Sequence, residues 1–145
     1  MAFSVDEIQD DILEYLRGQF VQPVQDDYLP NTETVARNAL GEIEPYLVVQ
    51  FGDLQPQNAY AMSGSWDDDY GMPVYVQCIS ADPKIGRKLA NKCIRVLLGR
   101  SFPWSGQIRK RAGFNMFTID SSDNSVEAYA FPLFFTVLVQ VSTEA

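Results

Sequence analysis

Apolar residues recur at helical spacing near the amino terminus, where acidic residues occupy most of the positions between them. The apolar positions are Val5, Ile8, Ile12 and Leu16. Ser4, followed three residues later by Glu7, has the spacing of a capping box, in which each side chain accepts a hydrogen bond from the other residue's backbone N–H. The pattern predicts an amphipathic helix that begins after Ser4 and ends near Gly18.

A second helix is predicted between Asp82 and Gly99. Asp82 suits the cap, Pro83 the first helical position and Gly99 the position just past the end. The expected buried stripe is Ile85, Leu89, Cys93, Val96 and Leu97. The expected exposed side is Lys84, Arg87, Lys88, Asn91, Lys92 and Arg95. No acid lies one turn away to pair with these bases, and each like-charge pair costs about 0.2–0.5 kcal/mol, so contact with a partner is favoured over a solvated face.

Runs of β-branched and aromatic residues predict the strands of the fold. They fall at 32–38, 46–54, 73–80, 114–119 and 126–142, the last divided or bulged at Pro132. A turn at Asn38–Glu44 with Gly41 makes a hairpin the simplest link between the first two. We expect one α+β domain over residues 1–145, with a mostly antiparallel or mixed sheet of about four to five strands against two main helices.

Three connecting segments have no clear period. Residues 20–29 are predicted to be an extended arm or a crossover, and 54–72 a long loop or a protruding hairpin. Residues 100–113 are predicted to be a loop that carries Trp104 and the basic tripeptide Arg109-Lys110-Arg111. Because long loops are often functional, residues 100–113 are a candidate functional segment.

The charges of this chain are strongly segregated. Residues 1–82 carry fifteen acids and two bases, residues 83–119 nine bases and no acid, and residues 120–145 four acids, for a net charge of −8. Such a dipole favours a partner of the opposite pattern, and a second copy of the same chain has that pattern. Head-to-tail contacts of this kind close into rings or grow into filaments.

Candidate chemistry beyond charge pairing is limited. Arg109, Lys110 and Arg111 with Trp104 have the composition of a single-strand binder, which leaves nucleic-acid binding open. Asp67, Asp68 and Asp69 are candidate cation ligands, but the twelfth position of a calcium loop counted from Asp67 is Cys78, which favours an acidic partner or solvent face. Phe102, Trp66 and Trp104 are candidate apolar anchors of an interface.

The chain shows no signature of an enzyme. It has no histidine, no phosphate-binding glycine loop, no dinucleotide fingerprint and no nucleophile elbow, so we expect no catalytic activity and no cofactor. Cys78 and Cys93 lie in apolar patterns, and we expect buried free thiols, with a disulfide left open. The most apolar run, 131–139, is far shorter than the roughly 20 residues of a membrane helix, and the amino terminus lacks the features of a secretory signal.

Two segments carry a resemblance to a known family. They are the strand PYLVVQFGD at 45–53 and the strand and helix PVYVQCISADPKIGRKLANKCIRVLLG at 73–99. In this order, between an amino-terminal helix with an arm and a set of late strands, they resemble the tail terminator proteins of long-tailed, non-contractile bacteriophages. The resemblance covers most of the chain as an order of elements.

The resemblance implies a structural virion protein with no reaction and no cofactor. It implies a ring of copies, usually six, on the end of the tail tube, which stops polymerisation and forms the interface to the head–neck connector or stopper protein. DNA is then only cargo in the channel, no membrane is involved, and the location is the tail–neck region of the virion, with the host cytoplasm during assembly.

The charges allow a specific hypothesis for such a ring. The bases Lys84, Arg87, Lys88, Lys92, Arg95, Arg109, Lys110 and Arg111, with Trp104, form the expected subunit or partner interface. Asp67 to Asp69 or the acidic first helix face the channel or a partner. The alternatives are another neck, head-completion or minor tail protein, and a nucleic-acid-binding module that uses residues 84–111.

Overall fold

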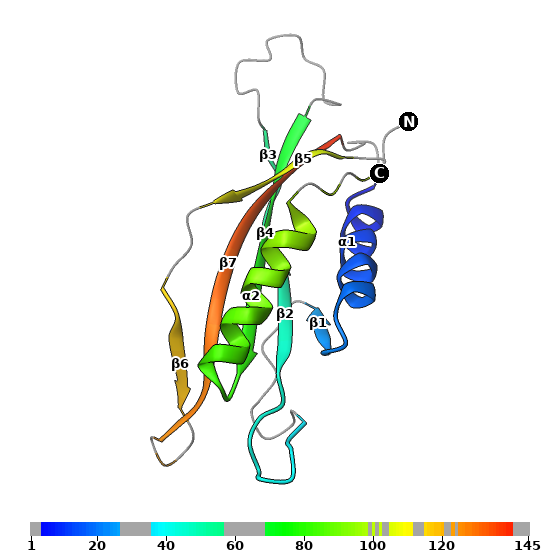
Figure 1. The fold of residues 1–145 in the computed structure, drawn as a ribbon. Coiled ribbons are helices and arrows are strands. Elements are labelled where there is room, and N and C mark those ends of the chain that lie inside the picture. Colours follow the sequence, from blue (N-terminus) through cyan, green and yellow to red (C-terminus); the bar gives the residue numbers. More distant parts are fainter. Residues whose placement is uncertain are drawn as a thin grey trace.

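The computed structural model describes residues 4–26, 36–56, 69–98, 100, 102, 105–111, 115–120, 123 and 125–140. Within these ranges the chain forms two helices and a mixed sheet of seven strands, which confirms the α+β class (Figure 1). In chain order the elements are α1 (Val5–Gln19), β1 (Val24–Asp26), β2 (Tyr46–Phe51), β3 (Gln55–Pro56), β4 (Asp69–Ser80), α2 (Pro83–Leu97), β5 (Ser105–Arg111), β6 (Phe117–Asp120) and β7 (Val126–Gln140). The strands outnumber the four to five expected.

The sheet is built around two long antiparallel strands. β4 and β7 pair from Asp69 with Gln140 to Ser80 with Tyr129. The order across the sheet is β1-β2-β4-β7-β5, with the short β3 against β4 and β6 against β7. Among the described strands, β1 and β2 alone pair in parallel. β1 and β5 therefore lie at opposite edges of the sheet.

The first helix begins and packs as its sequence predicts. The Ser4 hydroxyl accepts a hydrogen bond from the Glu7 N–H at 3.2 Å, and the Ser4 N–H donates to the Glu7 carboxylate at 3.4 Å, so both halves of the capping box are present. Ile8, Ile12 and Leu16 are buried, as expected. The helix extends one residue past Gly18, to Gln19.

The second helix confirms its predicted start but not all of its buried side. Asp82 accepts a hydrogen bond from the Lys84 N–H at 2.9 Å, and Pro83 is the first helical residue. Leu89, Cys93 and Leu97 are buried, whereas Ile85 is 40% exposed, so its predicted burial is wrong. Gly86 is buried instead of Ile85. The ring of Phe131 packs so close to the helix at this position that it leaves no room for a side chain.

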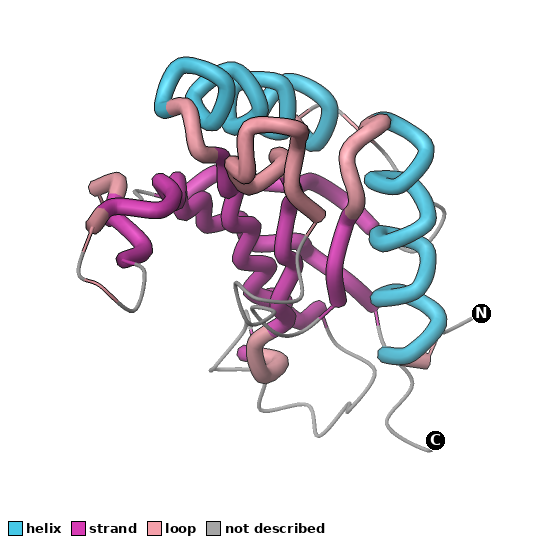
Figure 2. The backbone as a smooth tube through the Cα atoms, turned by 90° about the horizontal axis from the view of Figure 1, so that it is seen from below, coloured by secondary structure: helices cyan, strands magenta, loops and turns pink. Residues whose placement is uncertain are grey.

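Both helices lie on the same side of the sheet (Figure 2). Their buried side chains meet one face of β2, β4 and β7 in the main core, which includes Leu47, Val76 and Phe135. A smaller cluster of Ile43, Tyr46, Val48, Ile79, Ala128 and Ala130 lies on the other face, near the end where β6 pairs with β7. The rest of that second face is not covered by any described helix.

Several connections differ from the sequence-based expectations. The segment expected to be an arm at 20–29 contains β1. This strand has three residues and is too short to show the alternation of apolar and polar residues that identifies a strand in a sequence. Residues 32–35 of the strand expected at 32–38 lie outside the described residues, and the remainder makes one bridge, from Arg37 to Ile43 across the turn at Gly41. β6 begins later than expected, at Phe117. β3 and the start of β4 form the base of a hairpin, as one alternative for 54–72 predicted, although residues 57–68 lie outside the described residues.

Pro132 neither divides β7 nor causes a bulge. The pairing of β4 with β7 runs without a shift through Gln77 and Pro132. On the other side of β7, β6 pairs up to Ala130 and β5 pairs from Phe134. Pro132 lies between these two partners, so its missing N–H costs no ladder hydrogen bond on that side.

Candidate functional site

The exposed side of α2 is cationic, as the sequence predicts. Lys84, Arg87, Lys88 and Arg95 are exposed. None of the four makes an ion pair with a described residue, and the ion pair found in the described ranges joins Arg37 and Glu127. The positive charge of this helix is therefore presented outward, with no ion pair to any residue that the structure describes.

Lys92 and Arg100 have internal packing roles. The Lys92 ammonium lies 4.8 Å from the ring centroid of Phe20, at the end of α1. The Arg100 guanidinium lies 4.7 Å from the ring centroid of Tyr15 and 5.1 Å from that of Phe102. The Lys92 contact joins α2 to the end of α1, and the contact of Arg100 with Tyr15 joins the segment after α2 to α1. Lys92 is half-buried and thus less available to a partner than the other bases of α2.

The basic tripeptide lies in an edge strand, so its prediction as part of a loop at 100–113 is wrong. Arg109, Lys110 and Arg111 belong to β5 and are exposed. Residues directly opposite in a sheet share a face, so Arg111 opposite Phe134 and Arg109 opposite Thr136 lie on the face away from the helices. Lys110 lies on the helix side. The tripeptide therefore does not form one patch with α2.

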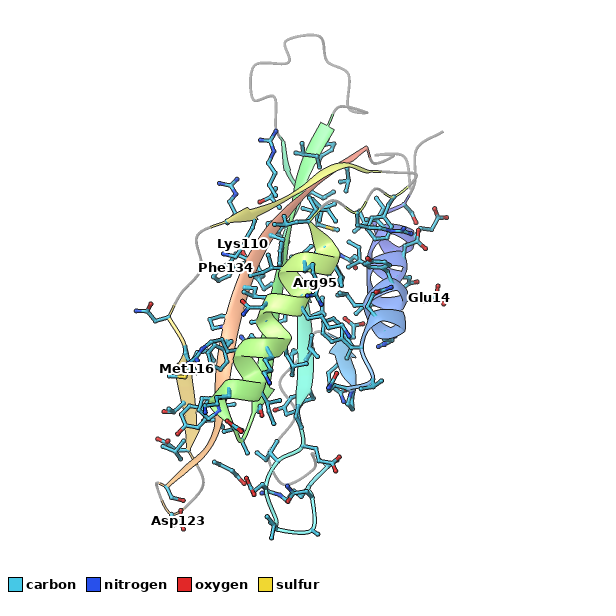
Figure 3. The ribbon with its side chains drawn as sticks, in the orientation of Figure 1. Glu14, Arg95, Lys110, Met116, Asp123 and Phe134 are labelled. Carbon is cyan, nitrogen blue, oxygen red and sulfur yellow. The ribbon has the colours of Figure 1, made fainter. Side chains whose placement is uncertain are left out.

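The strongest negative charge in the described chain lies on α1, at the other edge of the sheet. Its exposed acids are Asp6, Glu7, Asp10, Asp11 and Glu14. α1 packs beside β1, whose last residue, Asp26, is also exposed. Figure 3 shows Glu14 and Lys110 on opposite sides of the molecule, with Arg95 between them. Further carboxylates, Asp120 and Asp123, lie where β6 turns toward β7.

Four of the predicted site residues have little or no structural description. Trp104, Asp67 and Asp68 lie outside the described residues, as does the candidate anchor Trp66. Asp69 is the first residue of β4, and its backbone pairs opposite Gln140. Their predicted roles as an interface anchor and as a lumen or partner face stay predictions. Among the described residues, no cluster of His, Cys, Asp and Glu has the arrangement of a metal site.

A hollow of about 610 Å³ lies on the uncovered face of the sheet, and no motif in the sequence predicts it. Its lining is Gln50, Tyr75, Gln77, Asn115, Phe117, Pro132, Leu133 and Phe134. The rings of Tyr75 and Phe134 meet edge to face, with centroids 4.6 Å apart. Gln77 Oε1 is buried and has no hydrogen-bond partner among the described residues. Such volumes are typical of ligand pockets, which span roughly 300–1,000 Å³.

The two cysteines are buried free thiols, as predicted. Burial raises the pKa of the Cys93 thiol to about 12, because the charged thiolate would lose its hydration. Burial also raises the pKa of Cys78, with a smaller contribution from Cys93. Both side chains belong to the core between β4 and α2 and are unsuited to nucleophilic chemistry.

None of the described helices is both long and apolar enough to cross a membrane.

In the comparisons with known proteins, no family model matches the chain, and the search of curated proteins finds no relative. The candidate site is therefore defined by residues alone, as three surfaces: the acidic α1 edge, the basic side made by α2 with Lys110 of β5, and the hollow on the uncovered sheet face.

Proposed function

We propose that this chain is the subunit of a tail terminator, a ring that caps the tail tube of a long-tailed, non-contractile bacteriophage. In this role it stops tube polymerisation and forms the interface to the head–neck connector. Its partners are other copies of itself, in a ring of six, the tail tube protein and the connector, and DNA passes through the ring as cargo. The role involves neither catalysis nor a cofactor.

The observation that carries the proposal is the separation of charge along one sheet. The acids of α1 lie at the β1 edge, whereas the exposed bases of α2 and Lys110 lie toward the β5 edge. When copies are placed side by side, the acidic edge of one faces the basic side of the next. Such a contact joins two different surfaces, so it generates a ring when the rotation closes.

Complementary charge would also prevent wrong arrangements. Two acidic edges repel each other, and so do two basic sides, which leaves the head-to-tail order as the favourable one. The channel assignment of Asp67 to Asp69 stays part of the proposal, because an acidic lumen does not retain phosphate. α1 is assigned here to the lateral contact and not to the channel.

A tube-growth assay with charge-reversal variants tests the proposal. The wild-type protein, added to polymerising tube protein, should stop growth at a fixed length. Asp10→Lys with Glu14→Lys, or Lys88→Glu with Arg95→Glu, should each abolish this effect. Mixing the two variants should restore part of it, because each supplies the surface complementary to the other. The matched control reverses two exposed acids outside the acidic edge, Asp53→Lys with Asp120→Lys, and should still stop growth.

The exposed bases of α2 favour one competing function, nucleic-acid binding. A module of that kind would bind free DNA, with an affinity that falls steeply with salt in proportion to its phosphate contacts. A terminator should bind free DNA weakly at any salt concentration near the physiological one. Strong, salt-sensitive DNA binding together with failure to stop tube growth would replace the terminator proposal with the nucleic-acid one.

A further inference from the structure

One apolar side chain is held in solvent by a well-ordered turn. Leu40 is 83% exposed at the tip of the hairpin formed by residues 36–44. Asn38 Oδ1 accepts hydrogen bonds from the N–H groups of Leu40 at 2.9 Å and Glu42 at 3.0 Å, and Gly41 adopts φ +80°. These hydrogen bonds define the backbone of the turn, which presents the Leu40 side chain to solvent.

The base of the hairpin fixes the direction of its tip. Ile43 is buried with Tyr46, Val48 and Ile79, and the Arg37 guanidinium pairs with the Glu127 carboxylate and donates to the Gly41 carbonyl oxygen at 2.8 Å. These contacts anchor the hairpin at the sheet end farthest from β3. The hollow on the uncovered face lies farther along the sheet, so the tip cannot enter the hollow of its own chain.

The hollow is complementary to the hairpin tip, because it offers aromatic surface and lies beside an arginine. Its floor is aromatic, from Tyr75 and Phe134, and Phe117 at its side is 41% exposed. In the row across the sheet, Gln50 lies opposite Tyr75, Tyr75 opposite Phe134, and Phe134 opposite Arg111. The Arg111 Nε donates to Thr136 Oγ1 at 2.9 Å, which positions the guanidinium at the edge of this row.

We infer that the hollow receives the hairpin tip of a second copy of this chain. Leu40 packs against Tyr75, Phe134 and Phe117, and the exposed carboxylate of Glu42 pairs with Arg111. Gln77 Oε1, which has no described partner, accepts a backbone N–H of the incoming tip. A single exposed leucine is ordinary on a protein surface. A rigid tip that combines a leucine with a carboxylate is matched here by an aromatic hollow beside an arginine.

This contact is separate from the charged lateral contact of the proposed function. It joins two different surfaces of two copies, so it too is head-to-tail and contributes to a ring or a stack. It does not depend on a tail tube or on any phage partner. Its failure therefore leaves the terminator proposal standing, and failure of the terminator proposal leaves this contact standing.

Disulfide trapping between two variants, each with one introduced cysteine, tests the contact directly. Concentrated Leu40→Cys protein, mixed with Asn115→Cys protein and oxidised, should give the mixed dimer as the main product. The native thiols do not interfere, because Cys78 and Cys93 are buried. The matched control replaces Leu40→Cys with Val21→Cys, at an apolar side chain that is 96% exposed, lies between α1 and β1 and is not part of the predicted contact. Equal trapping by the control, or no mixed dimer from Leu40→Cys, would overturn the inference.

A charge swap identifies the occupant of the hollow. Glu42→Arg and Arg111→Glu should each weaken self-association about tenfold in sedimentation equilibrium, and the double variant should recover most of that loss. Thermal unfolding checks that each variant is folded. If both single changes leave self-association at the wild-type level while Arg111→Glu weakens binding to another protein, the hollow belongs to that protein and the inference is wrong.

Discussion

The hydroxyl of Tyr15 in α1 donates a hydrogen bond of 2.7 Å to the carbonyl oxygen of Val96 in α2. The same tyrosine ring packs edge to face on Phe102, with centroids 5.5 Å apart, and the Arg100 guanidinium lies over it. One side chain thus holds the acidic helix against the end of the basic helix. The separation of the two charged surfaces depends on this contact as well as on the sheet.

Tyr15→Phe isolates that hydrogen bond. The phenylalanine keeps the ring contacts but leaves the Val96 carbonyl oxygen without its partner, so the free energy of unfolding should fall by about 0.5–1.5 kcal/mol. Urea unfolding measures the change. The control is Tyr129→Phe, because the Tyr129 hydroxyl makes no hydrogen bond within the described residues, and its effect should be close to zero. Equal effects of the two changes would remove the Tyr15 hydrogen bond from the account.

Gly86 is predicted to be required by the ring of Phe131. A Cβ at this position would lie 2.6 Å from Phe131 Cε2 and 2.7 Å from Cδ2, so Gly86→Ala should destabilise the protein by about 1–3 kcal/mol despite the better helix propensity of alanine.

Gly18 in α1 provides the matched control for Gly86. It has nothing within 4 Å of a built Cβ, and Gly18→Ala should stabilise the protein by about 0.5–1 kcal/mol. The two alanine variants are compared by thermal or urea unfolding. Changes of the same sign would show that the Phe131 contact is not what selects glycine at position 86.

The buried thiols should make stability fall at alkaline pH. Their pKa values are raised in the folded protein, to about 12 for Cys93, so the unfolded chain loses its thiol protons first as the pH rises above about 9. The stabilising contribution of each thiol is complete below its unfolded pKa and is lost as the pH approaches the folded value. The loss is about 1.4 kcal/mol per pH unit for each thiol.

Cys93→Ala separates this effect from the titration of lysines and tyrosines. The variant should be less stable at pH 7 because it loses core packing, but its stability should fall less steeply between pH 9 and 10.5 than that of the wild type. Urea midpoints at a series of pH values give both slopes. Parallel slopes would contradict the raised pKa of Cys93.

Assembly through the charged edges should weaken with salt. The Debye length falls from about 10 Å at 0.1 M to about 3 Å at 1 M, so sodium chloride should shift copies from the assembled to the dissociated state over this range. Sedimentation velocity follows the change. The hairpin contact is partly apolar and should survive better, so cross-linking of Leu40→Cys to Asn115→Cys should decline less than assembly does. Assembly that strengthens with sodium chloride would contradict the lateral contact.

Both helices could be predicted because their signals are local. Ser4 with Glu7, and Asp82 with Pro83, define each start within a few residues, and the apolar spacing defines the buried face. The exception is Ile85, whose apolar character suggested burial. Its exposure follows from the distant Phe131, which occupies the space above Gly86.

The edge strands could not be predicted because their environment removes the usual pattern. β5 buries one described side chain, Ile108, and its Arg109, Lys110 and Arg111 point into solvent on both faces, so the run resembles a basic loop. β1 is only three residues long. In half-buried antiparallel strands, apolar and polar residues alternate clearly. In an edge strand with solvent on both sides, they need not alternate.

The hollow could not be predicted because its residues meet only through strand register. Gln50, Tyr75, Phe117 and Phe134 come from four strands, and each is unremarkable in its own segment. The available signal was the alternation of Tyr75 and Gln77 with buried valine and cysteine in β4. That alternation indicates a face that is not fully buried, but not what lies beside it.

Electron microscopy of tail tubes mixed with the purified protein tests the central claim most directly. The account predicts a ring of this protein on one end of each tube, with the acidic α1 edge of each copy against the basic α2 side of its neighbour, and no further growth from that end. Bare tube ends under conditions where the protein is folded, or protein bound along the tube walls with growth unchanged, would contradict it.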